Sequence, residues 1–180
     1  EFYEESGGGI TLSGGEVLQQ HAFAVELLKE AQSRGLHCAA ETTGYASHEV
    51  FREFVEYIDL LLFDMKHWDR EKHFEKTGVY NDIILENMGY AVSQGIPLIA
   101  RIPVIPKFNA SLKDAAGMAE NLCKLGIREV HLLPFHQFGE KKYEQLETEY
   151  EMSGVPQLHP EQLQKYIQVF LDRGLDASFK

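Results

Sequence analysis

The stretch "MAENLCKLGIREVHLLPF", residues 118–135, joins a helical pattern to a strand-like run through a single glycine. Apolar residues recur at the spacing of one helix face, at Ala115, Met118, Ala119 and Leu122. Gly126 then allows the left-handed backbone that commonly ends a helix, and the apolar run 129–135 follows. The stretch therefore predicts a helix that ends at Gly126 and leads into a strand.

The same junction recurs along the chain, which indicates a repeated β/α architecture. Glycines stand between helical and apolar segments at Gly35, Gly95, Gly126 and Gly174. The predicted strands are 10–14, 37–41, 59–65, 98–105, 129–135 and 176–179. Alternating strands and helices favour an α/β fold of parallel β/α units in one domain, residues 1–180, as an open sheet or a barrel. Near-continuous apolar runs predict strands covered on both faces.

Helix start signals agree with this alternation. Ser47 and Ser111 are predicted N-caps, and Pro160 is expected in a first helical turn. The charged stretch 139–152 is predicted to be a long surface excursion.

Composition excludes several classes of protein. The 180 residues carry a formal net charge of −11, which argues against nucleic-acid binding. No apolar run is long enough to span a membrane, and the N-terminus does not resemble a secretory signal. Cys38 and Cys123 lie far apart and suggest reduced thiols, so we expect a cytoplasmic protein.

Polar residues gather where each predicted strand ends. These stretches are 13–16, 41–44, 64–67, 106–109 and 134–137. Because parallel strands place their carboxyl ends at one edge, we expect these residues to form one rim, where such folds bind ligands.

The residue types predict a zwitterionic ligand, one that carries a positive and a negative group. Gly14 and Gly15 allow close approach to the backbone, with Glu16 beside them to face a cation. Glu41 and Asp64 suit a metal ion or an ammonium group, and Lys66 suits a carboxylate. Helix capping by these acids and a simple tight turn at the glycines are the structural alternatives.

The histidines and one arginine predict different roles. His131 and His136 fall on opposite strand faces, so only His136 is a rim candidate. We expect His67 and His73 to pack on the surface of a following helix. Arg101 shares a strand face with Ile99 and Pro103, where an inward charge needs a partner or a function.

Five ordered motifs resemble the radical S-adenosylmethionine enzymes that activate glycyl-radical enzymes, the pyruvate formate-lyase activating enzymes among them. The motifs are "SGGGITLSGGEVLQQ", "ETTGY", "LLLFDMKHWD", "RIPVIPKFN" and "LLPFHQFGEKKY". The resemblance implies a partial parallel β/α barrel. It also implies a four-iron four-sulfur (4Fe-4S) cluster that reduces S-adenosylmethionine, giving a 5'-deoxyadenosyl radical that takes a hydrogen atom from a glycine of the protein partner.

The resemblance assigns roles to particular residues. Gly14, Gly15 and Glu16 match a motif that engages the amino group of the methionine moiety. The other expected cofactor-binding residues are Glu41, Asp64, Met65, Lys66 and His136. Glu41 and Asp64, with the backbone carbonyls of Thr42 and Leu62, are candidates for a monovalent cation site. Arg101 is expected near the partner's glycine loop.

One family feature is absent from the sequence. The C-x-x-x-C-x-x-C motif, whose thiolates hold the cluster, does not occur in these 180 residues. We therefore expect the C-terminal part of a longer enzyme, lacking its first β/α unit and inactive by itself. The family also implies a flavodoxin or ferredoxin-type electron donor. Which glycyl-radical enzyme is the partner stays open.

Three alternatives remain beside this interpretation. A divalent-metal-dependent β/α-barrel lyase or hydrolase would use Glu41, Asp64 and His136, but leaves the glycine turn unexplained. "LSGGE" is similar to an ABC-transporter signature, yet the sequence has no phosphate-binding G-x-x-x-x-G-K-[ST] motif. A non-catalytic binding domain is the third alternative.

Overall fold

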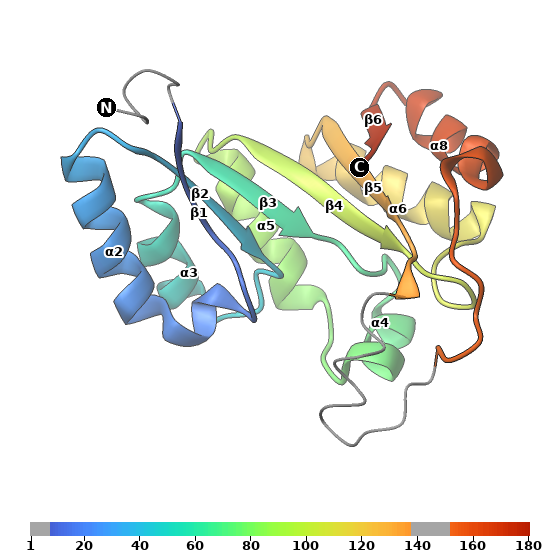
Figure 1. Ribbon diagram of the computed structural model, residues 1–180, viewed down its shortest axis with the longest axis horizontal. Coiled ribbons are helices and arrows are strands. Elements are labelled where there is room, and N and C mark those ends of the chain that lie inside the picture. The colour runs from blue at the N-terminus through green and yellow to red at the C-terminus, as the bar shows by residue number, and fades with distance from the viewer. Residues whose placement is uncertain (1–7, 138–151) are drawn as a thin grey trace.

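The strands form one six-stranded parallel sheet in the computed structural model, which describes residues 8–137 and 152–180 (Figure 1). Their order in the sheet is their order in the chain. The strands are β1 (Gly9–Leu12), β2 (His37–Thr42), β3 (Leu60–Asp64), β4 (Leu98–Val104), β5 (Glu129–Pro134) and β6 (Asp176–Phe179). All five pairs of neighbours are parallel, so their carboxyl ends meet at one edge. Every predicted strand is confirmed to within a few residues.

Helices connect successive strands as the sequence predicts. They are η1 (Val17–Gln20), α2 (His21–Ser33), α3 (His48–Val55), α4 (Arg70–Thr77), α5 (Asp82–Ser93), α6 (Leu112–Leu125), η3 (Pro160–Leu163) and α8 (Gln164–Leu171). Ser47 and Ser111 cap α3 and α6 through their side chains, and Pro160 opens η3. The predicted glycine stops all have positive φ, at Gly35, Gly95, Gly126 and Gly174. Both the start signals and the stop signals are therefore confirmed.

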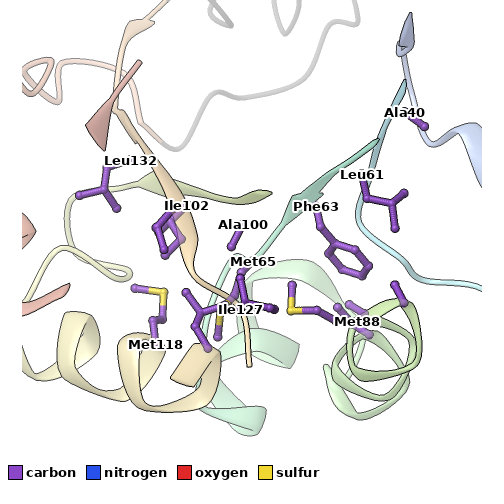
Figure 2. Packing of buried hydrophobic residues seen from close by; sticks show 14 of the residues in the cluster. Ala40, Leu61, Phe63, Met65, Met88, Ala100, Ile102, Met118, Ile127 and Leu132 are labelled. Carbon is purple, nitrogen blue, oxygen red and sulfur yellow. The ribbon is translucent and has the colours of Figure 1, made fainter. Parts of the chain in front are cut away.

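The two faces of the sheet differ in cover. Burial alternates along β3, β4 and β5, with Leu61, Phe63, Ala100, Ile102 and Leu132 fully buried. These side chains meet Met88 of α5 and Met118 of α6 (Figure 2). We call this side the helix-covered face; in Figure 1, α5 and α6 lie behind the strands.

The opposite side, which we call the open face, carries partly exposed residues. They are Glu41, Leu62, Asp64, Ile99, Arg101, Pro103 and His131. The expectation of strands covered on both faces is therefore wrong for the described residues. The alternation of buried and exposed residues in β3 and β4 was not visible in the sequence. Leu62 and Ile99 are apolar although they lie on the open face, so the apolar runs of both strands look continuous.

The structure bears on two further expectations, the surface excursion of the charged stretch and the lack of a membrane-spanning run. Residues 138–151, nearly all of the charged stretch 139–152, lie outside the described residues. Within residues 8–137 and 152–180, no helix has the length and apolar character needed to cross a membrane.

Candidate functional site

Three neighbouring strands align polar side chains in one row of the open face. The register pairs Asp64 of β3 with Arg101 of β4, and Arg101 with His131 of β5. Glu41 of β2 pairs with Leu62, one step back along β3. The strand ends thus bring together Glu41, Asp64 and Arg101, as the sequence predicts.

Arg101 sits between the two carboxylates and contacts both. Its Nη1 forms an ion pair with Glu41 Oε1, and its Nε lies 3.7 Å from Asp64 Oδ1. Lys66 adds a second cation, with Nζ 3.6 Å from Asp64 Oδ2. Two carboxylates therefore face two cations, which gives the cluster Glu41–Arg101–Asp64–Lys66 a balanced charge.

The two carboxylates differ in electrostatic environment. Burial would raise the pKa of Glu41, but hydrogen bonds from Ser13 and Arg101 outweigh it, so the pKa falls below its ordinary value. Burial raises the pKa of Asp64, and Lys66 and Arg101 offset this only in part. Negative charge is thus better stabilised on Glu41 than on Asp64.

The turn after β1 leaves its backbone open to a ligand. Gly14 has φ 131°, a conformation that side chains disfavour, and within the described part of the chain no atom beyond the adjoining residues lies within 4 Å of a Cβ built on Gly14 or Gly15. A pocket of about 350 Å³ borders Gly15 on one side. A second, of about 260 Å³, is lined by Thr43, Asp64 and Lys66 among others.

Glu16 is engaged by groups of the protein itself. Its Oε1 accepts hydrogen bonds from Leu18 N (3.1 Å) and Thr42 Oγ1 (2.7 Å). Its Oε2 accepts from the backbone N and the Oγ1 of Thr43, at 2.9 and 2.5 Å. Both carboxylate oxygens thus join the β1 turn to the end of β2, and the bond from Leu18 N caps η1, which is the structural alternative to a ligand contact.

The remaining predicted residues are spread over different environments. Met65 is 2% exposed and packs in the core, so its side chain is turned away from the rim (Figure 2). The Thr42 side chain is buried against Glu16, and Leu62 lies mid-strand between β2 and β4. His136 follows β5 and is exposed. Of the predicted set, Glu41, Asp64, Lys66 and Arg101 form the contiguous polar cluster.

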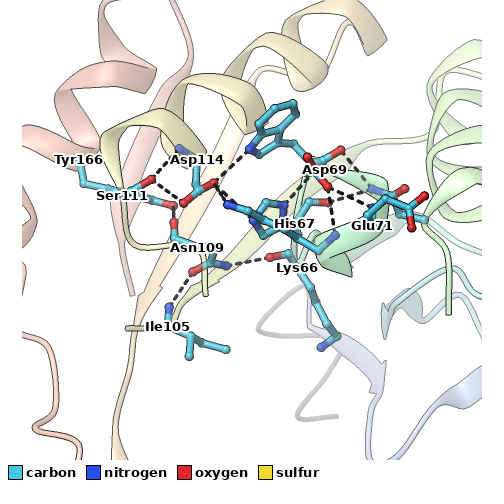
Figure 3. A network of polar contacts seen from close by, with 12 residues as sticks. Lys66, His67, Asp69, Glu71, Ile105, Asn109, Ser111, Asp114 and Tyr166 are labelled. Atoms are coloured by element: carbon cyan, nitrogen blue, oxygen red, sulfur yellow. Dashed lines mark hydrogen bonds and ion pairs between the residues drawn. The ribbon is translucent and has the colours of Figure 1, made fainter. Parts of the chain in front are cut away.

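The expectation of surface packing for His67 and His73 is wrong. Both are buried, at 1% and 3% exposure. His67 Nδ1 accepts from the Asp69 backbone N–H (2.9 Å), which places its proton on Nε2, 3.4 Å from Asp114 Oδ1. Burial lowers the pKa of His67 against the opposing effect of Asp114, which favours the neutral ring. These contacts belong to a polar network beneath the rim (Figure 3).

Three buried asparagines hold the rim loops; the sequence placed Asn109 in the predicted rim stretch 106–109, but it gave Asn81 and Asn87 no role. Asn87 donates to the carbonyls of Gly44 and Ala46, at 2.8 and 3.0 Å. Asn81 donates to the carbonyls of His67 and Trp68. Asn109 donates to those of Lys66 and Pro103. Their position beside turns was visible in the sequence, but their burial was not.

The described residues do not fit an iron–sulfur cluster. Cys38 is buried on the helix-covered face and Cys123 lies in α6, so neither faces the rim. No group of three or more His, Cys, Asp or Glu among the described residues could hold a metal ion. Arg101 occupies the position between Glu41 and Asp64, so a monovalent or divalent cation bound there would have to displace its guanidinium.

The rim does fit an amino-acid moiety. Space lies where Gly14 and Gly15 would carry Cβ atoms, so an ammonium could approach their backbone, and Lys66 could pair with a carboxylate. Methionine, the zwitterionic end of S-adenosylmethionine, has both groups.

The chain is similar in sequence and fold to known proteins. No protein-family model matches it. It is 42% identical over 172 residues to the 4-hydroxyphenylacetate decarboxylase activating enzyme of Clostridioides difficile, covering 94% of this chain and 54% of the relative. The choline trimethylamine-lyase activating enzyme of Oleidesulfovibrio alaskensis is 40% identical over 168 residues, 91% of this chain and 54% of the relative. The chain thus spans about half the length of these relatives.

A crystal structure of a domain of pyruvate-formate lyase-activating enzyme from Bacteroides vulgatus matches with a TM-score of 0.79 and 31% identity. The match covers 96% of this chain and 99% of that domain. The six-stranded parallel sheet with its helices is the partial β/α barrel of radical S-adenosylmethionine enzymes. Within that class, the chain belongs to the glycyl-radical enzyme activating enzymes.

Proposed function

We propose that the chain supplies the rim on which a glycyl-radical enzyme activating enzyme holds the methionine end of S-adenosylmethionine. When bound there and reduced by one electron through a 4Fe-4S cluster, S-adenosylmethionine would release methionine and supply the 5'-deoxyadenosyl radical, which would take a hydrogen atom from a glycine of the partner protein. Residues 1–180 act as one domain in this proposal. The names of the relatives support a glycyl-radical decarboxylase or lyase as the partner class.

The observation that carries the proposal is the charge-balanced cluster beside an open glycine turn. Glu41 and Asp64 are neutralised by Arg101 and Lys66, so the site has no net charge to repel either end of a zwitterion. Lys66 is about one-third exposed and is free to turn from Asp64 toward a ligand carboxylate. The carbonyls of Gly14 and Gly15 accept from the ligand ammonium.

Arg101 and Glu41 set the shape of the site in this proposal. Because Glu41 also accepts from Ser13 Oγ (2.8 Å), it ties the turn after β1 to Arg101 on β4. Arg101 also faces the open side of the sheet, where the partner's glycine loop would enter. His136, exposed beyond β5, borders the adenosyl end.

The proposal does not assign the binding of the 4Fe-4S cluster to this chain. A cluster held by other cysteines and an electron donor of the flavodoxin or ferredoxin type remain part of the proposal for the activity as a whole. The residues described bind and orient; they supply no ligand for iron.

The proposal is tested by titrating the 180-residue chain with S-adenosylmethionine. We expect weak binding, with Kd on the order of 1 mM, because no cluster cysteines are present to add chelation by iron. Lys66→Ala and Gly15→Val should weaken it about fivefold or more, since each removes or blocks a direct contact. Lys113→Ala, on the exposed first turn of α6, is the matched control. Affinity unchanged by both rim variants contradicts the proposal, as does submicromolar binding.

A further inference from the structure

The carbonyl of Lys66 is held by a fully buried side chain. Asn109 Nδ2 donates to Lys66 O at 2.7 Å and to Pro103 O at 2.8 Å. Its Oδ1 accepts from the Ile105 backbone N–H at 2.7 Å. Asn109 is 0% exposed, so this carboxamide makes all of these bonds without competition from bulk water (Figure 3).

The backbone of Asn109 is fixed as well. Its carbonyl accepts from Tyr166 Oη on α8 (3.0 Å), and its N–H donates to Ile105 O (3.2 Å). Tyr166 is itself 2% exposed. The carboxamide therefore cannot shift without disturbing the core, and it transmits the position of β4 and α8 to Lys66.

The turn that carries Asn109 is strained. Lys107 has φ 64°, the only positive φ of a non-glycine residue in the described part of the chain. A conformation of this kind persists only where surrounding contacts impose it, and the bonds of Asn109 to Ile105 span it. The unfavourable backbone conformation of Lys107 is thus part of the turn that brings the Asn109 side chain under Lys66.

We infer that Asn109 is a positioning residue that sets Lys66 against Asp64 and the rim; the inference rests on the proposed function, in which Lys66 meets the ligand carboxylate. Lys66 is two residues past the end of β3, beyond the strand ladder, so its own strand does not fix it. Asn109 takes over that task by joining Lys66 to Pro103, near the end of β4.

Asn81 provides a matched control. It is 3% exposed and donates its carboxamide to His67 O and Trp68 O, the carbonyls that follow Lys66 in the same loop. Asn81→Ala and Asn109→Ala thus remove the same chemical group from the same loop, but only Asn109 contacts Lys66. A purely structural role predicts similar effects for both.

The test labels lysine amines with 13C-methyl groups by reductive methylation and identifies the Lys66 resonance by its loss in Lys66→Arg. We expect Asn109→Ala to move this resonance and to weaken S-adenosylmethionine about fivefold. Asn81→Ala should shift the Lys66 resonance by less than its line width and should change the affinity for S-adenosylmethionine by less than about twofold. An unmoved Lys66 resonance in Asn109→Ala, or equal movement in Asn81→Ala, overturns the inference.

Two further outcomes keep the inference separate from the proposed function. If Lys66 moves in Asn109→Ala but the unaltered chain does not bind S-adenosylmethionine, Asn109 positions Lys66 and the proposed function fails. If Asn109→Ala does not fold, hydrogen exchange of the Asn109 carboxamide in the unaltered chain decides. Slow exchange supports the inference, and exchange as fast as an exposed amide overturns it.

Discussion

The helix-covered face and the open face are built from the same strands, yet they follow different rules. On the helix-covered face, Phe63 and Ile102 are fully buried among apolar neighbours. On the open face, one residue away along each strand, Asp64 and Arg101 form a partly exposed ion cluster. One face therefore supplies the stability of the fold, and the other is the face that we propose binds a ligand.

The largest expected difference separates two adjacent residues of β3. Phe63→Ala should lower the free energy of unfolding by about 3–5 kcal/mol, because it empties a site packed against Phe51. Leu62→Ala, on the open face, should cost about 1 kcal/mol, since that side chain is only partly buried. Urea unfolding measures both. Losses that agree within about 0.5 kcal/mol would remove the distinction between the faces.

A second test concerns close packing under the rim. A Cβ on Gly117 of α6 would lie 2.3 Å from the ring of Trp68, so Gly117→Ala should destabilise by about 1–3 kcal/mol. Gly89 of α5 is the control, because its Cβ would meet only a Leu125 methyl at 3.3 Å. Gly89→Ala should be neutral or stabilising by up to about 1 kcal/mol. Thermal unfolding that ranks the two variants in the opposite order contradicts this packing.

The smallest effect is electrostatic and belongs to the open face. Arg101→Gln removes a hydrogen bond and a positive charge, so the pKa values of Glu41 and Asp64 should both rise. Carbon-13 NMR titration of the two carboxyl groups measures this. Arg52→Gln, whose guanidinium lies over the Tyr90 ring, is the control and should move neither pKa.

The sign for stability follows from the direction of each shift. Because Glu41 has a lowered pKa, its contribution to the free energy of unfolding is present above about pH 4.3. This contribution is lost as the pH falls through the folded-state pKa. Asp64 has a raised pKa, so its contribution is present below about pH 3.9 and is lost as the pH rises through the folded-state value. A Glu41 pKa that does not change in Arg101→Gln would show that the ion pair is not formed in solution.

The sequence predicted the β/α order because its signals are local. Gly126 ends a helix and Ser111 begins one through contacts within a few residues, so neither depends on the rest of the fold. The convergence of Asp64 and Arg101 was also predictable, since parallel strands align their ends. What could not be predicted depends on long-range packing.

His67 and Glu16 show the limit. His67 was predicted to pack on the surface of a following helix, but α6 brings Asp114 beside its ring and buries it. Glu16 was predicted to face a cation, and the sequence could not show that the end of β2 also brings Thr42 and Thr43 to its carboxylate. In both cases the deciding partner is distant in sequence, and no local pattern marks it.

The most direct test of the account maps amide chemical shifts of the 15N-labelled chain during titration with S-adenosylmethionine. We predict saturable shifts centred on Gly14, Gly15 and Lys66, with small changes on the helix-covered face. Methionine alone should perturb the same amides, because the proposal places its zwitterionic end there. Shifts centred on the helices, or no saturable shifts at the rim, would contradict the assignment of the open face as the ligand site.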